Sequence, residues 1–138
     1  MTHADLPPTA ARSALMSRVR SKNTKPEMVV RRVAHSLGYR FRLARSDLPG
    51  TPDLVFPRHR KIIFVHGCFW HRHEGCPRTT VPKTRAPFWQ AKFDRNVARD
   101  QETSAALAAL GWDVLTIWEC ETKNPDTIRQ KILEFILA

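Results

Sequence analysis

The stretch DLVFPRHRKIIFVH, residues 53–66, decides the fold that we expect for this chain. Two runs that are apolar after their first residue, residues 53–56 and 61–65, stand on either side of a short polar loop at residues 57–60. Short runs rich in β-branched and aromatic residues, separated by a few turn residues, are typical of paired strands. The stretch therefore predicts an antiparallel β-hairpin.

The sequence before the hairpin predicts a helix followed by a strand. Residues 24–27, TKPE, form a capping box, in which the Thr24 hydroxyl accepts from the amide of Glu27 and the Glu27 carboxylate reaches back to the amide of Thr24. An apolar stripe with helical spacing follows, and Gly38 is a typical helix stop. Residues 39–43, YRFRL, alternate apolar and basic side chains and predict a half-buried strand.

The sequence after the hairpin predicts two helices and one more strand. Residues 66–85 form a loop with Gly and Cys, and Pro87 then opens a long helix to about Leu110. Residues 114–118, VLTIW, predict a buried strand, and Pro125 opens a final helix with an apolar stripe. This order of helices and strands indicates a mixed α/β domain.

The length of the chain and the composition of its N-terminal region indicate how its domains are organised. A chain of 138 residues fits a single domain, and we expect one over residues 1–138. Residues 1–9 contain two prolines and no periodicity, which predicts a loose arm, and residues 10–20 can form a helix. No apolar run approaches the roughly 20 residues that span a bilayer, and no secretory signal is visible. We therefore expect a soluble, cytoplasmic protein.

The charge balance favours nucleic acid as a partner. Lys and Arg number 23 against 13 Asp and Glu, which gives a formal charge of +10. Basic side chains that neutralise phosphates release condensed counterions, and this release favours binding to a polyanion. The alternative is that the excess charge only keeps the protein soluble.

Cysteine and histidine gather in the loop after the hairpin. The candidate metal ligands are Cys68, His73, Cys76 and the more distant Cys120. Thiolate and imidazole are the ligands that zinc prefers, and a set of four leaves no position open for water, so such a zinc would be structural. Two alternatives stay open: the cysteines are ordinary small core residues, or His71 takes the place of His73.

Asp53 is the first candidate for a catalytic residue. With the hairpin loop centred near His59, Asp53 pairs across from about Val65 and lies close to His66. A carboxylate and a main-chain carbonyl are hard oxygen ligands that suit Mg²⁺. The alternative is a turn-capping role, which is common for Asp. Other carboxylates that can contribute are Glu27, Asp100 and Glu119.

Aromatic and histidine side chains stand beside the candidate metal ligands. The adjacent Phe69 and Trp70 either fill the core or insert between base pairs, which unstacks and kinks a duplex. Trp89, near the start of the long helix, can add to either role. His66 and His71 flank the aromatic pair, and a neutral imidazole can take a proton from an attacking water near pH 7.

Four segments together resemble one known family. They are KNTKPE at residues 22–27, TPD at residues 51–53, VHGCFWH at residues 65–71 and WDVLTIWEC at residues 112–120. With this combination the chain resembles the very-short-patch-repair DNA mismatch endonucleases over residues 16–135, nearly its whole length. The resemblance implies a restriction-endonuclease-like fold, with a central mixed sheet flanked by helices and a zinc-stabilised loop.

The resemblance also implies an activity. Such enzymes recognise T:G mismatches that arise when 5-methylcytosine deaminates, and they nick the strand 5′ to the mismatched thymine. They act as monomers on double-stranded DNA at the bacterial nucleoid, with catalytic Mg²⁺ and structural Zn²⁺; contact with other mismatch-repair proteins stays open. Two alternatives remain for this chain: a restriction-type nuclease that cuts both strands, and a zinc-stabilised DNA-binding module without catalysis.

The resemblance implies catalytic roles for residues at matching positions. Asp53 is implied as the central Mg²⁺ ligand, joined by the carbonyl of Val65. His71 is implied as the base that activates water, oriented by Asp100. Glu27 is implied to hold metal-bound waters.

The remaining implied roles concern phosphate, zinc and the duplex. His66 is implied to bind near the Mg²⁺ ions or the scissile phosphate. The implied zinc ligands are Cys68, His73, Cys76 and Cys120. The implied DNA-intercalating wedge residues are Phe69, Trp70 and Trp89. Two features depart from the family pattern: residues 73–76 are one residue longer than usual, which Gly75 can absorb, and Val65 stands where Thr is usual, which a main-chain ligand tolerates.

Overall fold

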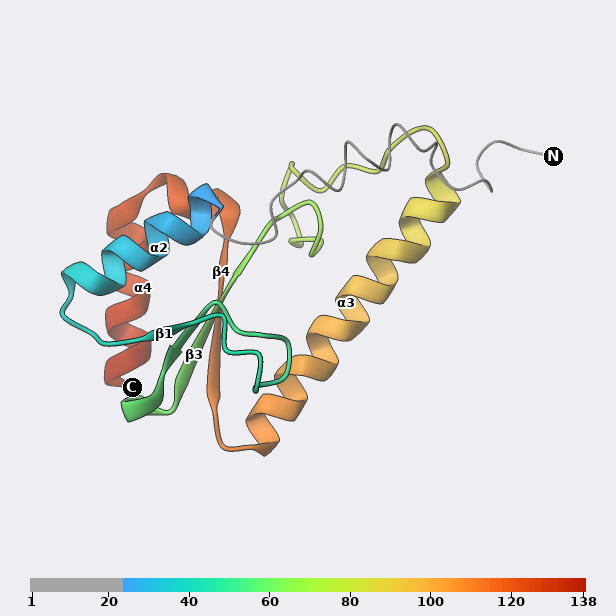
Figure 1. Ribbon diagram of the computed structural model, residues 1–138. Coiled ribbons are helices and arrows are strands. Elements are labelled where there is room, and N and C mark those ends of the chain that lie inside the picture. Colours follow the sequence, from blue (N-terminus) through green and yellow to red (C-terminus); the bar gives the residue numbers. More distant parts are fainter. Residues whose placement is uncertain (1–23) are drawn as a thin grey trace.

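The computed structural model describes residues 24–138 (Figure 1). The arm predicted for residues 1–9 and the helix predicted for residues 10–20 lie outside the described residues. Along the chain the main elements are α2 (Lys25–Ser36), β1 (Arg42–Leu43), β2 (Leu54–Phe56), β3 (Lys61–His66), α3 (Ala86–Ala109), β4 (Asp113–Trp118) and α4 (Pro125–Leu137), with short 3₁₀ turns at Pro57–His59 and Glu119–Lys123. Helix α2 begins where the hydroxyl of Thr24 accepts a hydrogen bond from the amide of Glu27 at 3.4 Å, as predicted.

The strands among residues 24–138 form one mixed sheet in the order β1-β2-β3-β4. Strands β2 and β3 are the two arms of the predicted hairpin and pair antiparallel, with Leu54 opposite Ile63. Strand β4 pairs parallel with β3 along its whole length, and the last pair is His66 opposite Trp118. The prediction of a central mixed sheet flanked by helices is therefore confirmed.

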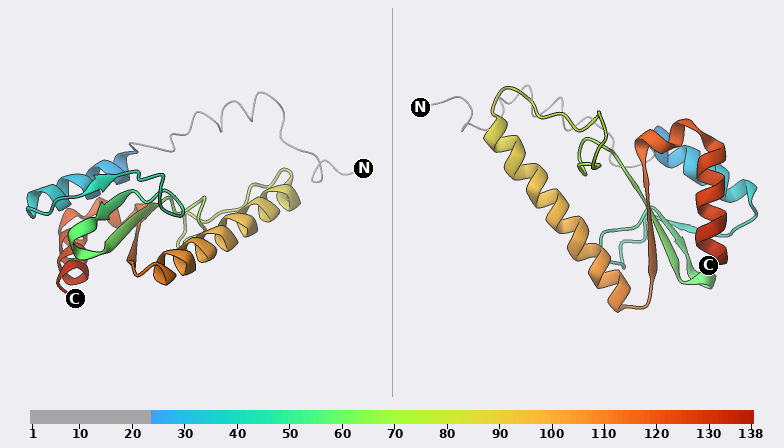
Figure 2. Two further views of the ribbon diagram at one scale, coloured as in Figure 1. Left: turned by 60° about the horizontal axis from the view of Figure 1, so that its bottom comes forward. Right: turned by 180° about the vertical axis from the view of Figure 1, so that it is seen from behind.

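Helices cover both faces of this sheet (Figure 1, Figure 2). Because successive strand residues point to opposite faces, the hairpin contributes to two apolar cores. The larger core, under α2 and α4, includes Val30, Leu54, Ile63, Ile117, Ile128 and Ile132. The smaller core, under the C-terminal part of α3, consists of Val55, Ile62, Phe64, Leu107 and Trp112. Toward its N-terminal end α3 diverges from the sheet (Figure 1), and residues of its middle part line the cavity of the candidate site.

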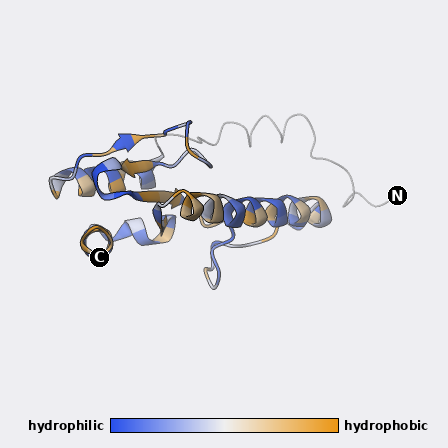
Figure 3. Ribbon diagram, turned by 90° about the horizontal axis from the view of Figure 1, so that it is seen from below, coloured by the Kyte–Doolittle hydropathy of each residue, from blue (hydrophilic) through white to orange (hydrophobic). Residues whose placement is uncertain are grey.

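Helix α3 is 24 residues long. It buries Trp89, Phe93 and Leu107, and hydrophilic positions lie between its hydrophobic ones in Figure 3. Within residues 24–138, no helix combines the length and the apolar character needed to cross a membrane.

Two strands differ from their predicted form. The strand predicted over residues 39–43 is reduced to Arg42–Leu43, because its partner β2 ends at Phe56, where a 3₁₀ turn begins, so residues 39–40 have no strand to pair with in that direction. Phe41 packs its ring on Phe56, with centroids 5.8 Å apart. The strand predicted as buried, β4, has only Ile117 fully buried. The reason is that β4 lies at the edge of the sheet formed by residues 24–138, so within these residues one side of it has no neighbouring strand.

Gly50 brings the loop before β2 close to α3. Its φ is +74°, and a Cβ atom at this position would lie 2.4 Å from Cγ2 of Thr103 and 3.3 Å from the ring of Phe64. Gly38 has a similar φ of +83°, but no heavy atom lies within 4 Å of the corresponding position. Substitution of Gly38 therefore tests the cost of backbone strain alone, whereas substitution of Gly50 adds the cost of steric overlap.

We expect Gly38→Ala to lower the free energy of unfolding by about 1 kcal/mol, because Ala disfavours a left-handed backbone. Gly50→Ala adds overlap with a packed helix and should lower it by roughly 2 to 4 kcal/mol. Urea denaturation of the two variants measures the difference, and Thr103→Ser should recover part of it in the Gly50→Ala background. Equal losses in the two glycine variants would contradict the packing of this loop on α3.

Candidate active site and metal centre

The β2–β3 hairpin positions Asp53. Its Oδ2 atom accepts a hydrogen bond from the amide of Val65 at 2.7 Å. Asp53 stands one residue before β2, and the hairpin pairs Leu54 with Ile63, so the carboxylate lies across from the end of β3. The register of the hairpin thus brings Asp53 beside the backbone of Val65 and toward His66.

A cavity of about 610 Å³ lies between this end of the hairpin and α3. Its lining includes six residues for which catalytic roles were expected: Glu27, Asp53, Val65, His66, His71 and Asp100. They come from α2, from both sides of the hairpin, from the loop after it and from α3. The fold therefore brings together groups that are widely separated in the sequence.

His71 and Asp100 form a hydrogen-bonded pair at one wall of the cavity. Nδ1 of His71 lies 2.7 Å from Oδ2 of Asp100, and both side chains are half-buried. An ionised carboxylate can only accept, so Nδ1 carries the proton and Nε2 of a neutral His71 keeps a free lone pair. A ring oriented in this way from a rigid helix is suited to taking a proton from water.

His66, the last residue of β3, stacks on His71. The ring centroids are 3.9 Å apart and the ring planes differ by 7°. Burial lowers the pKa of His66 to about 4, and the repulsion between the two imidazoles when His71 is also protonated adds to this shift. His66 is therefore neutral near pH 7, with one ring nitrogen able to donate and the other to accept.

Two carboxylates face the cavity in a poorly solvated position. Burial raises the pKa of Asp53 to about 6, with the hydrogen bond from Val65 opposing the shift and the charge of Glu27 adding to it. Glu27 is only 5% exposed, and its Oε2 accepts from the guanidinium of Arg31 at 3.2 Å. Carboxylate oxygens are hard donors, and a divalent cation stabilises the ionised form of a carboxyl group in such a place. The donor set therefore fits a hard ion such as Mg²⁺.

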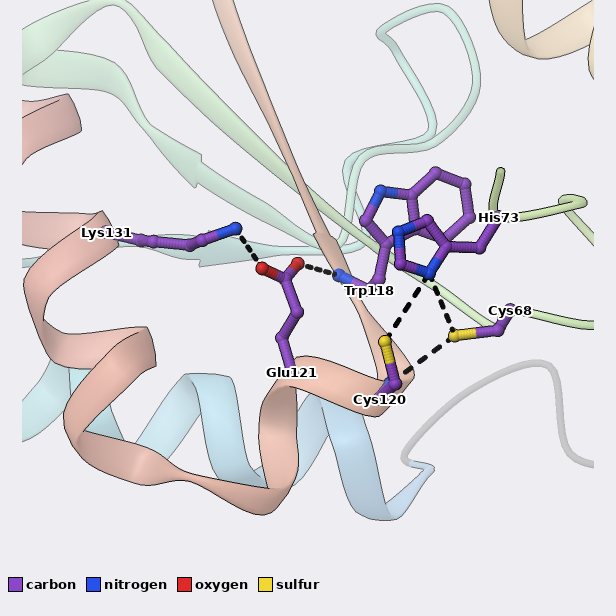
Figure 4. Close-up of polar contacts among 6 residues, drawn as sticks. All are labelled: Cys68, His73, Trp118, Cys120, Glu121 and Lys131. Atoms are coloured by element: carbon purple, nitrogen blue, oxygen red, sulfur yellow. Dashed lines mark hydrogen bonds and ion pairs between the residues drawn. The ribbon is translucent and has the colours of Figure 1, made fainter. Parts of the chain in front are cut away.

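Three thiols and one imidazole meet beyond the ends of β3 and β4. The ligand atoms of Cys68, His73, Cys76 and Cys120 all lie within 4.8 Å of one another. Nδ1 of His73 is 3.6 Å from Sγ of Cys68 and 3.4 Å from Sγ of Cys120 (Figure 4). Four donors of this kind fit a closed tetrahedral metal site, and zinc is the ion that such a set prefers.

The local geometry explains how this Cys/His cluster forms despite the additional residue in the loop. Gly75 takes a φ of +73°, and no heavy atom lies within 4 Å of the position that a Cβ atom would occupy. The loop can therefore turn back so that Cys76 faces His73. His71, the alternative fourth ligand, lies with Asp100 instead.

The predicted wedge residues pack into one aromatic cluster around Phe93. Ring centroids are 5.0 Å apart for Phe69 and Trp70, 5.1 Å for Phe69 and Phe93, and 6.1 Å for Trp70 and Trp89. Phe69 and Trp70 are half-buried, whereas Trp89 is only 3% exposed. Insertion of Trp89 into a duplex would therefore require this cluster to open.

Two residues that hold the loop were not predicted from the sequence. Arg72 takes a left-handed φ of 56° and donates to three main-chain carbonyls of the loop. Asn96 of α3 donates to the carbonyl of Trp70 at 3.2 Å. Neither has a local signal, because one more Arg in a basic chain is not distinctive and the partner of Asn96 is remote in sequence. Glu119, considered as a further catalytic carboxylate, pairs with Arg78 at 3.7 Å.

Comparison with known proteins places this site in a family. A family model described as DNA mismatch endonuclease Vsr matches residues 4–78, more than half of the chain. The chain belongs to the Vsr family of DNA endonucleases. The Vsr match covers the β2–β3 hairpin and the loop through Cys76, whereas Asp100 and Cys120 lie beyond it.

Relatives extend the Vsr-family similarity over nearly the whole chain. The type II nicking enzyme V.XorIIP of Xanthomonas oryzae pv. oryzae is 54% identical over 121 residues, which are 88% of each chain. The DNA mismatch endonuclease Vsr of Escherichia coli is 38% identical over 130 residues, which are 94% of this chain and 83% of that one. The type II nicking enzyme V.NmeAIP of Neisseria meningitidis is 36% identical over 128 residues, covering 93% of this chain and 91% of the relative.

The raised pKa of Asp53 determines how this site affects stability as pH changes. The folded state holds the Asp53 proton up to about pH 6, whereas an unfolded Asp loses it near the ordinary value of 3.8. Stability from this carboxyl is therefore present below the unfolded pKa and is lost as pH rises through the folded pKa. At neutral pH, and without a cation, the ionised group destabilises the fold.

We expect Asp53→Asn to be more stable than wild type by about 1 to 2 kcal/mol at pH 7.5 without added Mg²⁺, and to lose this advantage near pH 4. Asn keeps the shape and can still accept from the amide of Val65, but it carries no charge. Urea denaturation across this pH range measures the effect, with the exposed Asp126→Asn as the control. Destabilisation of Asp53→Asn at pH 7.5 would contradict the buried, ionised carboxylate.

Proposed function

We propose that this protein nicks DNA on the 5′ side of a mismatched thymine in T:G pairs, such as those left by deamination of 5-methylcytosine. As a member of the Vsr family it is a DNA nicking endonuclease, and the proposal specifies its substrate. The names of two relatives, both type II nicking enzymes, support a single-strand cut. The name of a third, DNA mismatch endonuclease, supports a mismatch as the target.

The observation that carries the proposal is the convergence of His66, His71, Asp100 and Asp53 on one cavity. In the proposed mechanism Asp100 holds Nδ1–H of His71, and Nε2 accepts a proton from the water that attacks the phosphorus atom. His66 is neutral near pH 7, so its N–H donates to an oxygen of the scissile phosphate without competing for the proton.

Asp53, the carbonyl of Val65 and Glu27 are the residues that would hold Mg²⁺, Glu27 through water. Mg²⁺, when bound, neutralises phosphate charge and stabilises the leaving oxygen. Asp53 is fixed for this role by the amide of Val65, and Glu27 by its place in the first turn of α2. Their mutual repulsion in a poorly solvated cavity disfavours two ionised carboxylates unless a cation lies between them.

We assign a structural role to zinc in the Cys/His cluster. Zinc bound by four protein ligands has no open position for substrate. Phe69, Trp70 and His71 lie between the ligands Cys68 and His73, so the metal would fix both the aromatic pair and the catalytic base. The Cys/His cluster would in this way hold the loop against the cavity.

DNA recognition in this proposal combines charge with deformation. The formal charge of +10 favours the phosphate backbone, and a mismatch is easier to kink than a paired step. Phe69, Trp70 and Trp89 would insert beside the mismatch once their cluster opens, at the cost of unstacking one base step. The residues that line this cavity all come from a single chain, so cutting one strand needs no group from a second subunit, which supports action as a monomer.

Two alternatives make different predictions about the products. A restriction-type nuclease would cut both strands of matched DNA. A DNA-binding module would bind without cutting, but buried carboxylates such as Asp53 and Glu27 repel phosphate and give a mere binder no advantage.

End-labelled T:G and T:A duplexes, incubated with and without Mg²⁺, test the proposal. We expect a single nick 5′ to the mismatched thymine, in the T:G duplex and only with Mg²⁺. Cleavage of both strands of the T:A duplex, or tight binding with no cut in any duplex, would overturn it.

In the same assay Asp53→Ala should reduce the nicking rate by roughly a thousandfold or more, because it removes the central cation ligand. Binding to the T:G duplex should stay within about threefold, since phosphate contacts dominate affinity. The control Asp126→Ala removes an exposed acid outside the cavity and should nick like wild type. Full nicking by Asp53→Ala at saturating Mg²⁺ would show that the assignment of Asp53 is wrong.

A further inference from the structure

Trp118 stands between the Cys/His cluster and the catalytic cavity. It is the last residue of β4 and lies opposite His66 in the parallel register. Cys120 follows it by two residues, just as Cys68 follows His66. The ends of β3 and β4 therefore lead into both sites, and Trp118 lies between the two sites.

The indole of Trp118 contacts one histidine from each site. It stacks on the imidazole of His73, with ring centroids 4.3 Å apart and planes 10° from parallel (Figure 4). It also meets His66 nearly at a right angle, with centroids 5.5 Å apart and an interplanar angle of 73°. The first contact restricts rotation of a metal ligand, and the second supports the ring that stacks on His71.

The backbone of Trp118 is itself anchored from the far side. Its amide donates to Oε1 of Glu121 at 2.8 Å, and the other carboxylate oxygen of Glu121 pairs with Lys131 of α4 (Figure 4). The main chain of Trp118 is thus held by its pairing with β3 and, through Glu121, by α4, and this fixes the point from which the indole extends.

We propose that Trp118 is a positioning residue shared by the two sites, which holds the His73 ring for metal binding and the His66 ring for contact with phosphate. The part that concerns His66 rests on the proposed function. Ligating imidazoles are usually oriented by a hydrogen bond from the second ring nitrogen, and losing such support weakens metal binding by roughly 10- to 100-fold. Here the face of the indole gives that support to His73.

Three variants separate positioning from packing. Trp118→Leu keeps apolar bulk but removes the flat face, and Trp118→Phe keeps a smaller flat face. Trp112→Leu is the matched control, because Trp112 is a buried tryptophan just before the same strand, with the Arg60 guanidinium 4.2 Å from its ring centroid and no part in either site. The free energy of unfolding of each variant shows how much of any effect is a general loss of stability.

The first measurement is the rate at which the zinc-loaded protein transfers zinc to a chromophoric chelator, with the cobalt-substituted absorption spectrum as a second report on ligand geometry. We expect transfer about tenfold faster in Trp118→Leu, an intermediate rate in Trp118→Phe and a rate within about twofold of wild type in Trp112→Leu. Equal rates for Trp118→Leu and wild type, or the same acceleration in Trp112→Leu, would overturn the proposal.

The second measurement concerns His66 and needs no DNA. The nuclear Overhauser effects between the imidazole protons of His66 and His71, which report the stacked geometry of the two rings, should weaken in Trp118→Leu and stay unchanged in Trp112→Leu. Faster zinc transfer with unchanged Overhauser effects between these two rings would overturn the shared role. Because neither measurement uses nicking, a wild-type protein that fails to cut the T:G duplex would refute the proposed function without affecting these results.

Discussion

The parallel pairing of β3 with β4 is the constraint on which both candidate sites depend. Its last pair sets His66 beside Trp118, and each strand continues for two residues to a cysteine, Cys68 or Cys120. The amide of Cys120 donates to Sγ of Cys68 at 3.4 Å, and the two sulfurs lie within 4.8 Å of each other, because the strands end in register. A slip by one residue would turn these side chains to opposite faces of the sheet, and neither site would form. The apolar cores on both faces are what specify this register.

The cavity contains ionisable carboxyl groups at positions where burial disfavours their charged form. The pKa of Asp53 is raised to about 6, and Glu27 is buried beside it with Arg31 as its ion-pair partner. Folding would be easier with neutral side chains at these positions, which is the usual conflict between stability and activity. The same poor solvation makes the oxygens effective ligands for a hard cation, and it leaves His66 uncharged next to His71. The destabilising and the useful features of the site therefore share one physical cause.

The fold was more predictable from local sequence than the site. The hairpin could be predicted from residues 53–66, because loop length and apolar runs are local signals, and its register correctly suggested that Asp53 lies beside Val65. The meeting of His71 with Asp100 has no local signal, since a loop and half of α3 separate them, and only the family resemblance suggested it. Burial of Trp89 could not be predicted either, because it depends on how α3 packs against the aromatic loop. Local sequence patterns predict helices and strands, whereas contacts between side chains that are remote in sequence depend on how these elements pack.

Zinc content measures most directly whether the β3–β4 register builds the Cys/His cluster. Protein purified without chelator should contain one zinc ion per chain by elemental analysis. The variant Cys120→Ser should lose most of that zinc although the other three ligands stay in place, because the ion then loses the only ligand supplied by the end of β4. Wild-type protein without zinc, or a Cys120→Ser chain that holds as much zinc as wild type after dialysis, would contradict the shared site at the two strand ends.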